Sequence, residues 1–292
     1  MRTSLIGLKV CLVVLAVTNV SAGVVSSVTD PTTNWTSIGV IGLDPSSDQQ
    51  TGQGQQDIVG TAANPGFYEA YDALNIYYRA RLGKQDAGGY ANLFWVGIDA
   101  NADGALDLFV GVKNQGSVGN YRIGFFAPGS GSNTSPNTTS IDNLLPQYEI
   151  METASNYDYQ LVSNIIAPGI TNTDLNADGN TDVFLSFRVP FAGASGTASL
   201  QGAMQGIAGI SINASTPLRY VIATSTQSNS LNQDLGGING GTSSTSTWAT
   251  LGAISPPTTL NGTVTPEPGS MTLFGVGVVL VLASRKYRAR RQ

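Results

Sequence analysis

The sequence predicts an all-β protein, built as a jelly-roll-like β-sandwich. Three observations predict this fold class. Between about residues 34 and 252 the apolar residues recur with a period close to 2, turn signals containing Gly, Asn and Pro are frequent, and helical periodicity is scarce. Hydrophobic residues make up 41 % of the 292 residues, so the chain has enough apolar side chains for a core. Many short strands with frequent turns are typical of a sandwich.

Strict alternation marks the individual strands. In the segment 106–113 (LDLFVGVK), Leu106, Leu108, Val110 and Val112 fall on one face of the predicted strand. The segment 183–189 alternates in the same way. Further strands are predicted at 76–82, 93–98, 121–127, 157–165 and 219–224.

One segment departs from the β pattern. In 199–210 (SLQGAMQGIAGI), Leu200, Met204 and Ile207 recur at helical spacing, while the glycines disfavour a long helix. A short helix or an irregular crossover is therefore expected there.

Composition excludes several chemistries. The chain has no His, which excludes a Ser-His-Asp triad, a Cys-His dyad and an imidazole metal site. Its single cysteine, Cys11, lies in a segment expected to be removed, so neither a disulfide nor thiol chemistry is expected. The basic residues gather at the two ends and the central part is acidic, so no nucleic-acid partner is expected.

The N-terminus has the three parts of a secretory signal. Arg2 and Lys9 supply the positive region, an apolar run covers 10–17, and small residues at 20–22 allow cleavage after Ala22. The expected partners are the Sec translocon and a signal peptidase. The alternative is an uncleaved membrane anchor, for which the run is short, because a spanning helix needs ~20 apolar residues.

The C-terminus carries a second three-part signal. Pro266-Glu267-Pro268 is followed by the apolar segment 271–283 (MTLFGVGVVLVLA), predicted as a transmembrane helix, and then by a basic cluster. The cluster consists of Arg285, Lys286, Arg288, Arg290 and Arg291.

This order closely resembles the PEP-CTERM sorting signal of Gram-negative bacteria. The resemblance implies a transient anchor in the inner membrane, cleavage near Pro-Glu-Pro by an exosortase-type membrane protease, and transfer to the cell surface or extracellular matrix. It also implies association with exopolysaccharide, an extracellular polysaccharide, as a partner. The alternative is a plain C-terminal membrane anchor.

These signals divide the chain into four parts: a signal peptide at 1–22, a secreted β-sandwich domain at 23–254, a polar linker at 255–265 and the sorting signal at 266–292. Between the two signals, seven basic and 18 acidic residues remain, which gives the exported part a net charge of −11. Such a domain is expected to be soluble and to avoid polyanions unless cations bridge the two.

Two loops share the pattern D-x-N-A-D-G-x-x-D. Oxygen ligands recur at loop positions 1, 3, 5 and 9, and Gly104 and Gly179 occupy position 6, where the loop must turn sharply. The pattern predicts structural Ca²⁺ in both loops, bound with the weak affinity of extracellular sites. The predicted ligands are Asp99, Asn101, Asp103 and Asp107 in the first loop, and Asp174, Asn176, Asp178 and Asp182 in the second.

The loops depart from an EF-hand in two ways. Position 12 is Val110 in one loop and Leu185 in the other, where an EF-hand has a bidentate Glu, and strands rather than helices are expected around them. The loops therefore resemble the calcium hairpins of bacterial surface proteins and those of dockerin and FG-GAP repeats. The alternative is a metal-free hairpin, since Asp-Gly and Asn-Asp also form good turns.

Three functions remain open. The first is a non-enzymatic surface or matrix protein. The second is a carbohydrate-binding module with structural Ca²⁺, in which exposed aromatic side chains stack on sugar rings. The alternative for these aromatic side chains is packing in the core. The third is a glycoside hydrolase using two of the carboxylates Glu69, Glu149 and Glu152, none of which has a recognisable context. We expect no enzymatic activity. The aromatics are Tyr77, Tyr78, Tyr90, Trp95 and Trp248.

Overall fold

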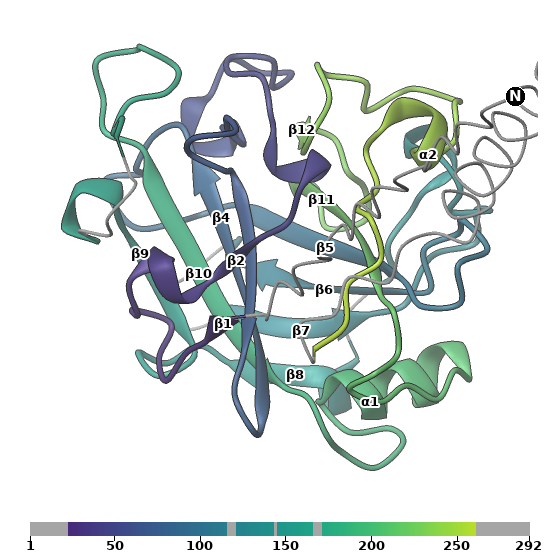
Figure 1. Ribbon diagram of the computed structural model, residues 1–292. Coiled ribbons are helices and arrows are strands. Elements are labelled where there is room, and N and C mark those ends of the chain that lie inside the picture. Colours follow the sequence, from purple (N-terminus) through teal and green to yellow (C-terminus); the bar gives the residue numbers. More distant parts are fainter. Residues whose placement is uncertain (1–22, 116–120, 143–144, 166–170, 261–292) are drawn as a thin grey trace, which may run out of the picture.

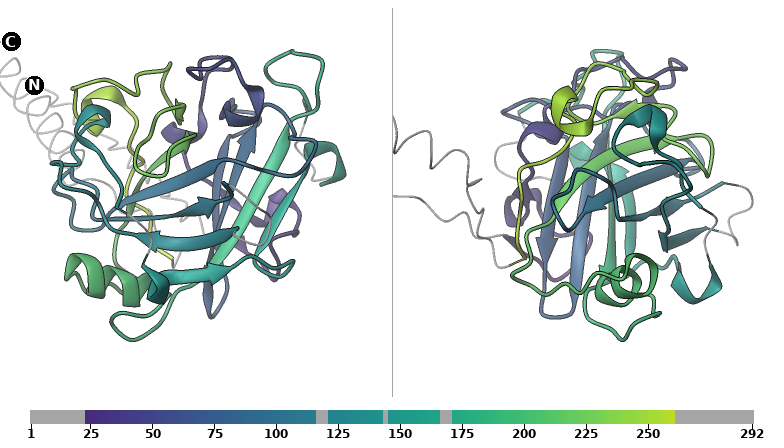
Figure 2. Two further views of the ribbon diagram at one scale, coloured as in Figure 1. Left: turned by 180° about the vertical axis from the view of Figure 1, so that it is seen from behind. Right: turned by 90° about the vertical axis from the view of Figure 1, so that its right-hand side faces the viewer.

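The computed structural model describes residues 23–115, 121–142, 145–165 and 171–260. They form two β-sheets of six strands each, packed against one another (Figure 1). The strands of the two sheets cross at a steep angle, as Figures 1 and 2 show. Such crossing is typical of orthogonal sheet packing. The predicted all-β class and its two-layer arrangement are confirmed.

The first sheet has the strand order β1-β3-β4-β10-β9, and β2 pairs with the free part of β3. All its pairs are antiparallel except the short parallel pair β1–β3. Its strands are β1 (Gly23–Val24), β2 (Thr36–Ser37), β3 (Phe67–Tyr71), β4 (Asn75–Leu82), β9 (Tyr157–Leu161) and β10 (Val183–Pro190).

The second sheet is antiparallel throughout and has the order β12-β11-β5-β6-β7-β8. Its strands are β5 (Leu93–Asp99), β6 (Leu108–Lys113), β7 (Arg122–Phe126), β8 (Glu149–Met151), β11 (Arg219–Ser225) and β12 (Asp234–Leu235).

Helical structure is brief. The segment 199–210, whose apolar residues recur at helical spacing, forms the helix α1 (Leu200–Ala203), which continues as a π-helix, η8 (Met204–Ala208). A second short helix, α2 (Trp248–Leu251), lies near the end of the domain. The hydroxyl of Ser199 accepts the N–H of Gly202 and so caps α1. The 3₁₀ turns of the described residues include η1 (Thr32–Asn34), η2 (Val40–Gly42), η3 (Gly54–Gln56), η5 (Pro136–Thr138), η6 (Pro146–Tyr148) and η7 (Val162–Asn164).

The connectivity is not that of a jelly roll. Most ladders join consecutive strands, as the pairs β3–β4, β9–β10 and β11–β12 and the meander β5–β8, and the ladders β4–β10 and β5–β11 join strands far apart in the chain. A jelly roll is instead built from two Greek keys. Tight turns favour the hairpins. Between β3 and β4, for example, Asp72 Oδ1 accepts the N–H groups of both Leu74 and Asn75, at 2.7 Å each. The predicted jelly-roll-like order is therefore corrected.

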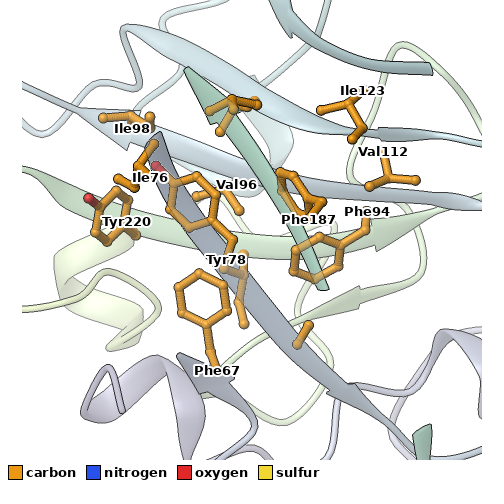
Figure 3. Close-up of a cluster of buried hydrophobic side chains, with 14 of the residues drawn as sticks. Phe67, Ile76, Tyr78, Phe94, Val96, Ile98, Val112, Ile123, Phe187 and Tyr220 are labelled. Carbon is orange, nitrogen blue, oxygen red and sulfur yellow. The ribbon is translucent and has the colours of Figure 1, made fainter. Parts of the chain in front are cut away.

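The main core fills the space between the sheets (Figure 3). Tyr78 of the first sheet packs against Phe187, with ring centroids 5.4 Å apart, and edge-on against Tyr220 of the second sheet at 5.8 Å. The predicted alternation in 183–189 is confirmed, because its apolar side chains all point into this core. These are Val183, Leu185, Phe187 and Val189.

Both outer faces of the sandwich are also covered. Trp95 and Phe109 lie on the outer side of the second sheet, under a cluster that includes Leu235 and Trp248 from the later part of the chain. On the outer side of the first sheet, the segment around Trp35 covers a third cluster. The aromatics named as sugar-stacking candidates are all buried, which confirms core packing for them. They are Tyr77, Tyr78, Tyr90, Trp95 and Trp248.

The folded domain extends beyond the predicted boundary at 254. Leu218 and Thr258 form a bridge with two backbone hydrogen bonds of 2.8 Å, and Leu260 is buried in the main core. Residues 255–260 are thus part of the domain, although their polar and Pro-rich composition predicts a linker. Among the described residues, no helix is long and apolar enough to cross a membrane. The predicted signal peptide and the predicted span 271–283 lie outside them.

Candidate functional site

The first Asp-rich loop connects β5 to β6. Asp99, the last residue of β5, accepts the N–H of Ala102 at 2.7 Å with Oδ1 and the N–H of Gly104 at 3.2 Å with Oδ2. At the other end, Asp107 Oδ2 accepts the N–H of Ala100 at 2.8 Å. The outer two carboxylates of the pattern therefore close the loop from both sides.

The inner two side chains form successive Asx turns. Asn101 Oδ1 accepts the N–H of Asp103 at 2.9 Å, and Asp103 Oδ1 accepts the N–H of Ala105 at 2.8 Å. All four predicted ligands of this loop thus bind its backbone.

The second loop, immediately before β10, repeats the arrangement. Asp174 accepts the N–H of Gly179 at 3.0 Å and the N–H of Asp178 at 3.2 Å. Asn176 Oδ1 accepts the same Asp178 N–H at 3.3 Å, and Asp178 Oδ1 accepts the N–H of Asn180 at 2.8 Å. The shared sequence pattern therefore produces a shared local structure.

The backbone of both loops turns at equivalent positions. Gly104 and Gly179 have φ of 85° and 84°, and Ala102 and Ala177 have φ of 62° and 55°. A left-handed conformation favours glycine, so the Gly at position 6 is explained by the turn itself. The alanines adopt this conformation at a cost of about 1–2 kcal/mol each.

Asp182 distinguishes the second loop from the first. Its Oδ2 accepts the N–H of Leu175 at 3.1 Å, as the pattern requires, and also binds the guanidinium of Arg81. Arg81 Nη2 in turn donates to the carbonyl of Asn172 at 2.6 Å, just ahead of the loop. The second loop is therefore fastened to β4 by an arginine.

Burial dominates the electrostatics of the first loop. It raises the pKa of Asp99 and of Asp107 above the usual range of aspartates, and the charge of Asp103 raises both further. Arg219 acts on Asp99 in the opposite direction. A bound cation would relieve the repulsion among these three carboxylates.

The geometry fits both interpretations of the pattern. A carboxylate oxygen that accepts one N–H retains a second lone pair, so the loop hydrogen bonds leave ligand capacity for a cation. Among the described residues, however, neither loop has three carboxylates whose oxygens all lie within 4.8 Å of one another. Binding Ca²⁺ through all three would therefore require the side chains to move inward.

A different group of carboxylates meets that distance. Oxygens of Asp44, Asp48 and Asp234 all lie within 4.8 Å of one another. Sequence reasoning missed this group because Asp234 is distant in sequence from the other two and no local motif connects them. The only local feature in the sequence is the pair Asp44 and Asp48, four residues apart. Two aspartates at this spacing are too common to predict a metal site.

A pocket of about 420 Å³ lies beside β9. Four tyrosines line it, together with several residues that have polar side chains. The lining consists of Gln85, Asp86, Ala87, Gly89, Tyr90, Asn114, Tyr121, Tyr157, Asp158 and Tyr159.

The three glutamates considered for hydrolysis lie in different settings. Glu69 is buried and accepts the Tyr220 hydroxyl at 2.7 Å, whereas Glu149 forms a partly exposed ion pair with Arg122 at 3.5 Å. Burial raises the pKa of Glu152 to about 7. Glu69 takes part in the core rather than facing a cleft.

The predicted sorting residues, Pro266 to Pro268 and the basic cluster, lie outside the described residues. A family model described as the PEP-CTERM protein-sorting motif matches residues 264–290. The chain is a PEP-CTERM domain-containing protein. The motif marks it as an exported protein that an exosortase-type membrane protease processes during sorting to the cell surface. The chain matches no curated protein and no solved structure, so the PEP-CTERM motif is the one family relationship that the comparisons show.

Proposed function

We propose that this PEP-CTERM protein is a non-enzymatic component of the cell surface or extracellular matrix, associated with exopolysaccharide. The sorting motif at 264–290 is the observation that carries the proposal. In the proposed route the signal peptide 1–22 directs the chain through the Sec translocon and signal peptidase removes it. The β domain then folds outside the inner membrane while the C-terminal segment holds it there until cleavage.

The composition of the domain agrees with this role. It has no histidine and no cysteine after residue 22, and its core is formed by two sheets with both outer faces covered. Its net charge of −11 keeps it soluble and repels other polyanions. Association with an acidic polysaccharide would therefore depend on divalent cations.

Calcium in the two Asp-rich loops is part of the proposal. The support is the repeated hydrogen-bond pattern, which places four oxygen-bearing side chains around each turn. Hard oxygen ligands of this kind suit Ca²⁺. In a domain without disulfides, the ions would stabilise the hairpins rather than act as a sensor.

The sorting step is tested with variants of the motif in the host. Replacing Pro266 and Glu267 by alanine should leave the protein in the inner-membrane fraction, while the wild type reaches the surface or the medium. Thr263→Ala, just ahead of the matched residues, is the control and should be sorted normally. Equal release of the motif variant and the wild type would contradict the proposal.

A second candidate function, carbohydrate binding, is favoured by the tyrosine-lined pocket beside β9. Sugars bind where aromatic faces stack on the ring and polar groups accept or donate to its hydroxyls, and this pocket offers both. Tyr121→Ala should reduce retention on the host's exopolysaccharide, whereas Tyr121→Phe, which keeps the ring, should retain it. Unchanged retention of the alanine variant would argue against this pocket.

A further inference from the structure

The group of carboxylates formed by Asp44, Asp48 and Asp234 joins two distant parts of the chain. Asp44 and Asp48 lie after η2, and Asp234 begins β12. Figure 1 shows the segment that follows η2 close to β12. A backbone hydrogen bond of 3.0 Å from Gln50 to Gln233 holds the two parts together.

Backbone N–H groups fix each carboxylate. Gly237 donates to Asp44 Oδ1 at 2.6 Å, and Gly240 donates to Asp48 Oδ2 at 2.8 Å. Asp234 Oδ2 accepts the N–H of Ile58 at 2.6 Å, from the segment after η3. The three side chains are therefore held close to one another by two separate stretches of backbone, one around Gly237 and Gly240 and one at Ile58.

Gly237 has to be a glycine in this arrangement. Its φ is 90°, and a Cβ there would lie 2.8 Å from the carbonyl oxygen of Val40. This close contact brings the Gly237 N–H to Asp44.

Two carboxylate oxygens in the group lack a partner. Asp44 is 3 % exposed, and its Oδ2 is buried with no hydrogen-bond donor among the described residues. The Oδ1 of Asp48 is in the same condition. A buried unpaired acceptor costs about 1–3 kcal/mol, and more if it is charged, so two of them beside a third carboxylate favour the binding of a positively charged group.

The surrounding charges do not supply that group. Besides burial, the charges that raise the pKa of Asp44 are those of Asp234, Asp48 and Asp57, all of them carboxylates. Asp57 is itself fully buried and accepts the N–H of Ser47 with both oxygens. The site thus accumulates negative charge away from water.

We propose that Asp44, Asp48 and Asp234 bind one divalent cation of the calcium class, which clips the segment after η2 to the start of β12. Oxygens coordinated to one Ca²⁺ at about 2.3–2.6 Å lie within about 5 Å of one another, and oxygens of these three carboxylates all lie within 4.8 Å of one another. The donors are all oxygens, which favours Ca²⁺ over zinc. This inference does not rest on the sorting route.

A pocket of about 320 Å³ borders the group. Asp44 lines it together with Pro45, Ser46, Gly60 and, from the second Asp-rich loop, Leu175. In the proposal the ion enters from this pocket. The proposed clip ties together residues about 190 positions apart, and closing so long a loop stabilises the fold by restricting the unfolded chain.

The proposal is tested by counting bound Ca²⁺ on the full-length protein in detergent, after EDTA treatment and reloading with calcium. Asp103→Asn combined with Asp178→Asn provides a background in which the two predicted loops are weakened. In that background, adding Asp44→Asn or Asp234→Asn should lower the count by one ion per chain. The matched control is the exposed Asp142, whose change to Asn should leave the count unaltered. An unaltered count in Asp44→Asn and Asp234→Asn would overturn the proposal.

A stability measurement separates cation binding from a merely structural role. Without calcium, Asp234→Asn should unfold at the same temperature as the wild type or higher, because one of three crowded charges is gone. With calcium, the protein that carries Asp103→Asn and Asp178→Asn should gain thermal stability, and adding Asp234→Asn to it should remove most of that gain. An equal gain in both proteins would overturn the site.

If the variants do not fold, amide hydrogen exchange measured on the wild type tests whether calcium binds at this site. Calcium should slow exchange of the amides of Gly237 and Gly240, which bind the carboxylates, and of the amides of residues 46–50. Exchange there that does not respond to calcium would overturn the proposal. The same measurement with Mg²⁺ reports selectivity, because Mg²⁺ demands shorter ligand distances of about 2.0–2.1 Å.

Discussion

Arg81 of β4 and Asp182 of the second Asp-rich loop form a buried ion pair, with 2.5 Å between Nη2 and Oδ2. The two side chains are 1 % and 0 % exposed. A second hydrogen bond of 2.7 Å runs from Nε to the same oxygen. The last ligand position of the second loop is therefore already neutralised by a protein cation, which is the main difference between the two loops.

Removing Arg81 should be costly. Arg81→Met leaves Asp182 buried and unpaired, and breaking such a pair typically destabilises by about 3–5 kcal/mol. The control is Arg122→Met, which removes the partly exposed pair with Glu149 and should cost less than about 1 kcal/mol. Urea unfolding monitored by fluorescence measures both. Equal losses of unfolding free energy in the two variants would show that burial does not strengthen the Arg81–Asp182 pair.

The two loops should differ in their response to calcium. Because Arg81 supplies positive charge only to the second loop, Asp103→Asn should reduce the calcium-dependent rise in Tm more than Asp178→Asn does. Differential scanning calorimetry with calcium and with EDTA measures the rise. If EDTA leaves the Tm of the wild type unchanged, the metal-free turn is the correct interpretation of the loops.

Glu69 should make the domain less stable as the pH rises. Burial raises its pKa from the ordinary 4.5 to about 7, although Tyr220 and Thr258 donate hydrogen bonds to it. The folded state thus holds the proton more tightly than the unfolded state. The stability is fully present below about pH 4.5 and is lost progressively up to about pH 7, by an amount on the order of 3 kcal/mol.

The Glu69→Gln variant isolates this contribution. It should lose the Glu69 share of the pH dependence and be more stable than the wild type at pH 8, as measured by unfolding at a series of pH values. A slope identical in wild type and Glu69→Gln would show that Glu69 titrates normally in the fold.

Backbone strain in the first loop predicts an opposite response of two neighbouring alanines. Ala102 has a φ of 62°, so Ala102→Gly should stabilise the protein by up to about 1 kcal/mol. Ala105 is not among the residues with positive φ, and Ala105→Gly should destabilise by about 0.5–1 kcal/mol. Thermal unfolding of the two variants gives the sign, and a loss of stability in Ala102→Gly would contradict the strain.

Much of the sheet structure follows from local pattern. The segments 76–82 and 183–189 appear as β4 and β10, and their alternation correctly gives the face that enters the core. The period-2 pattern identifies a face but not a partner strand. It therefore could not predict that β4 and β10, about a hundred residues apart, lie side by side, or that hairpins replace a jelly-roll order.

The features that were missed depend on long-range contacts. The segment 229–246 is polar and Gly-rich, a composition typical of a long loop, yet Leu231 and Leu235 in it cover the outer face of the second sheet. Asp234 lies in the same segment and meets Asp44 only after folding. In the two Asp-rich loops, by contrast, the predicted ligand side chains accept backbone N–H groups from within the same nine residues, so the sequence predicts the shared turn geometry.

The most direct test of the account is the intact mass of the protein recovered from the surface of its host. Export and sorting predict a single product that begins at Gly23 and ends close to Pro266–Pro268, without the basic cluster that follows the apolar segment. Recovery of a surface form that retains Arg285 to Arg291 would contradict processing at the PEP-CTERM motif, and with it the proposed route.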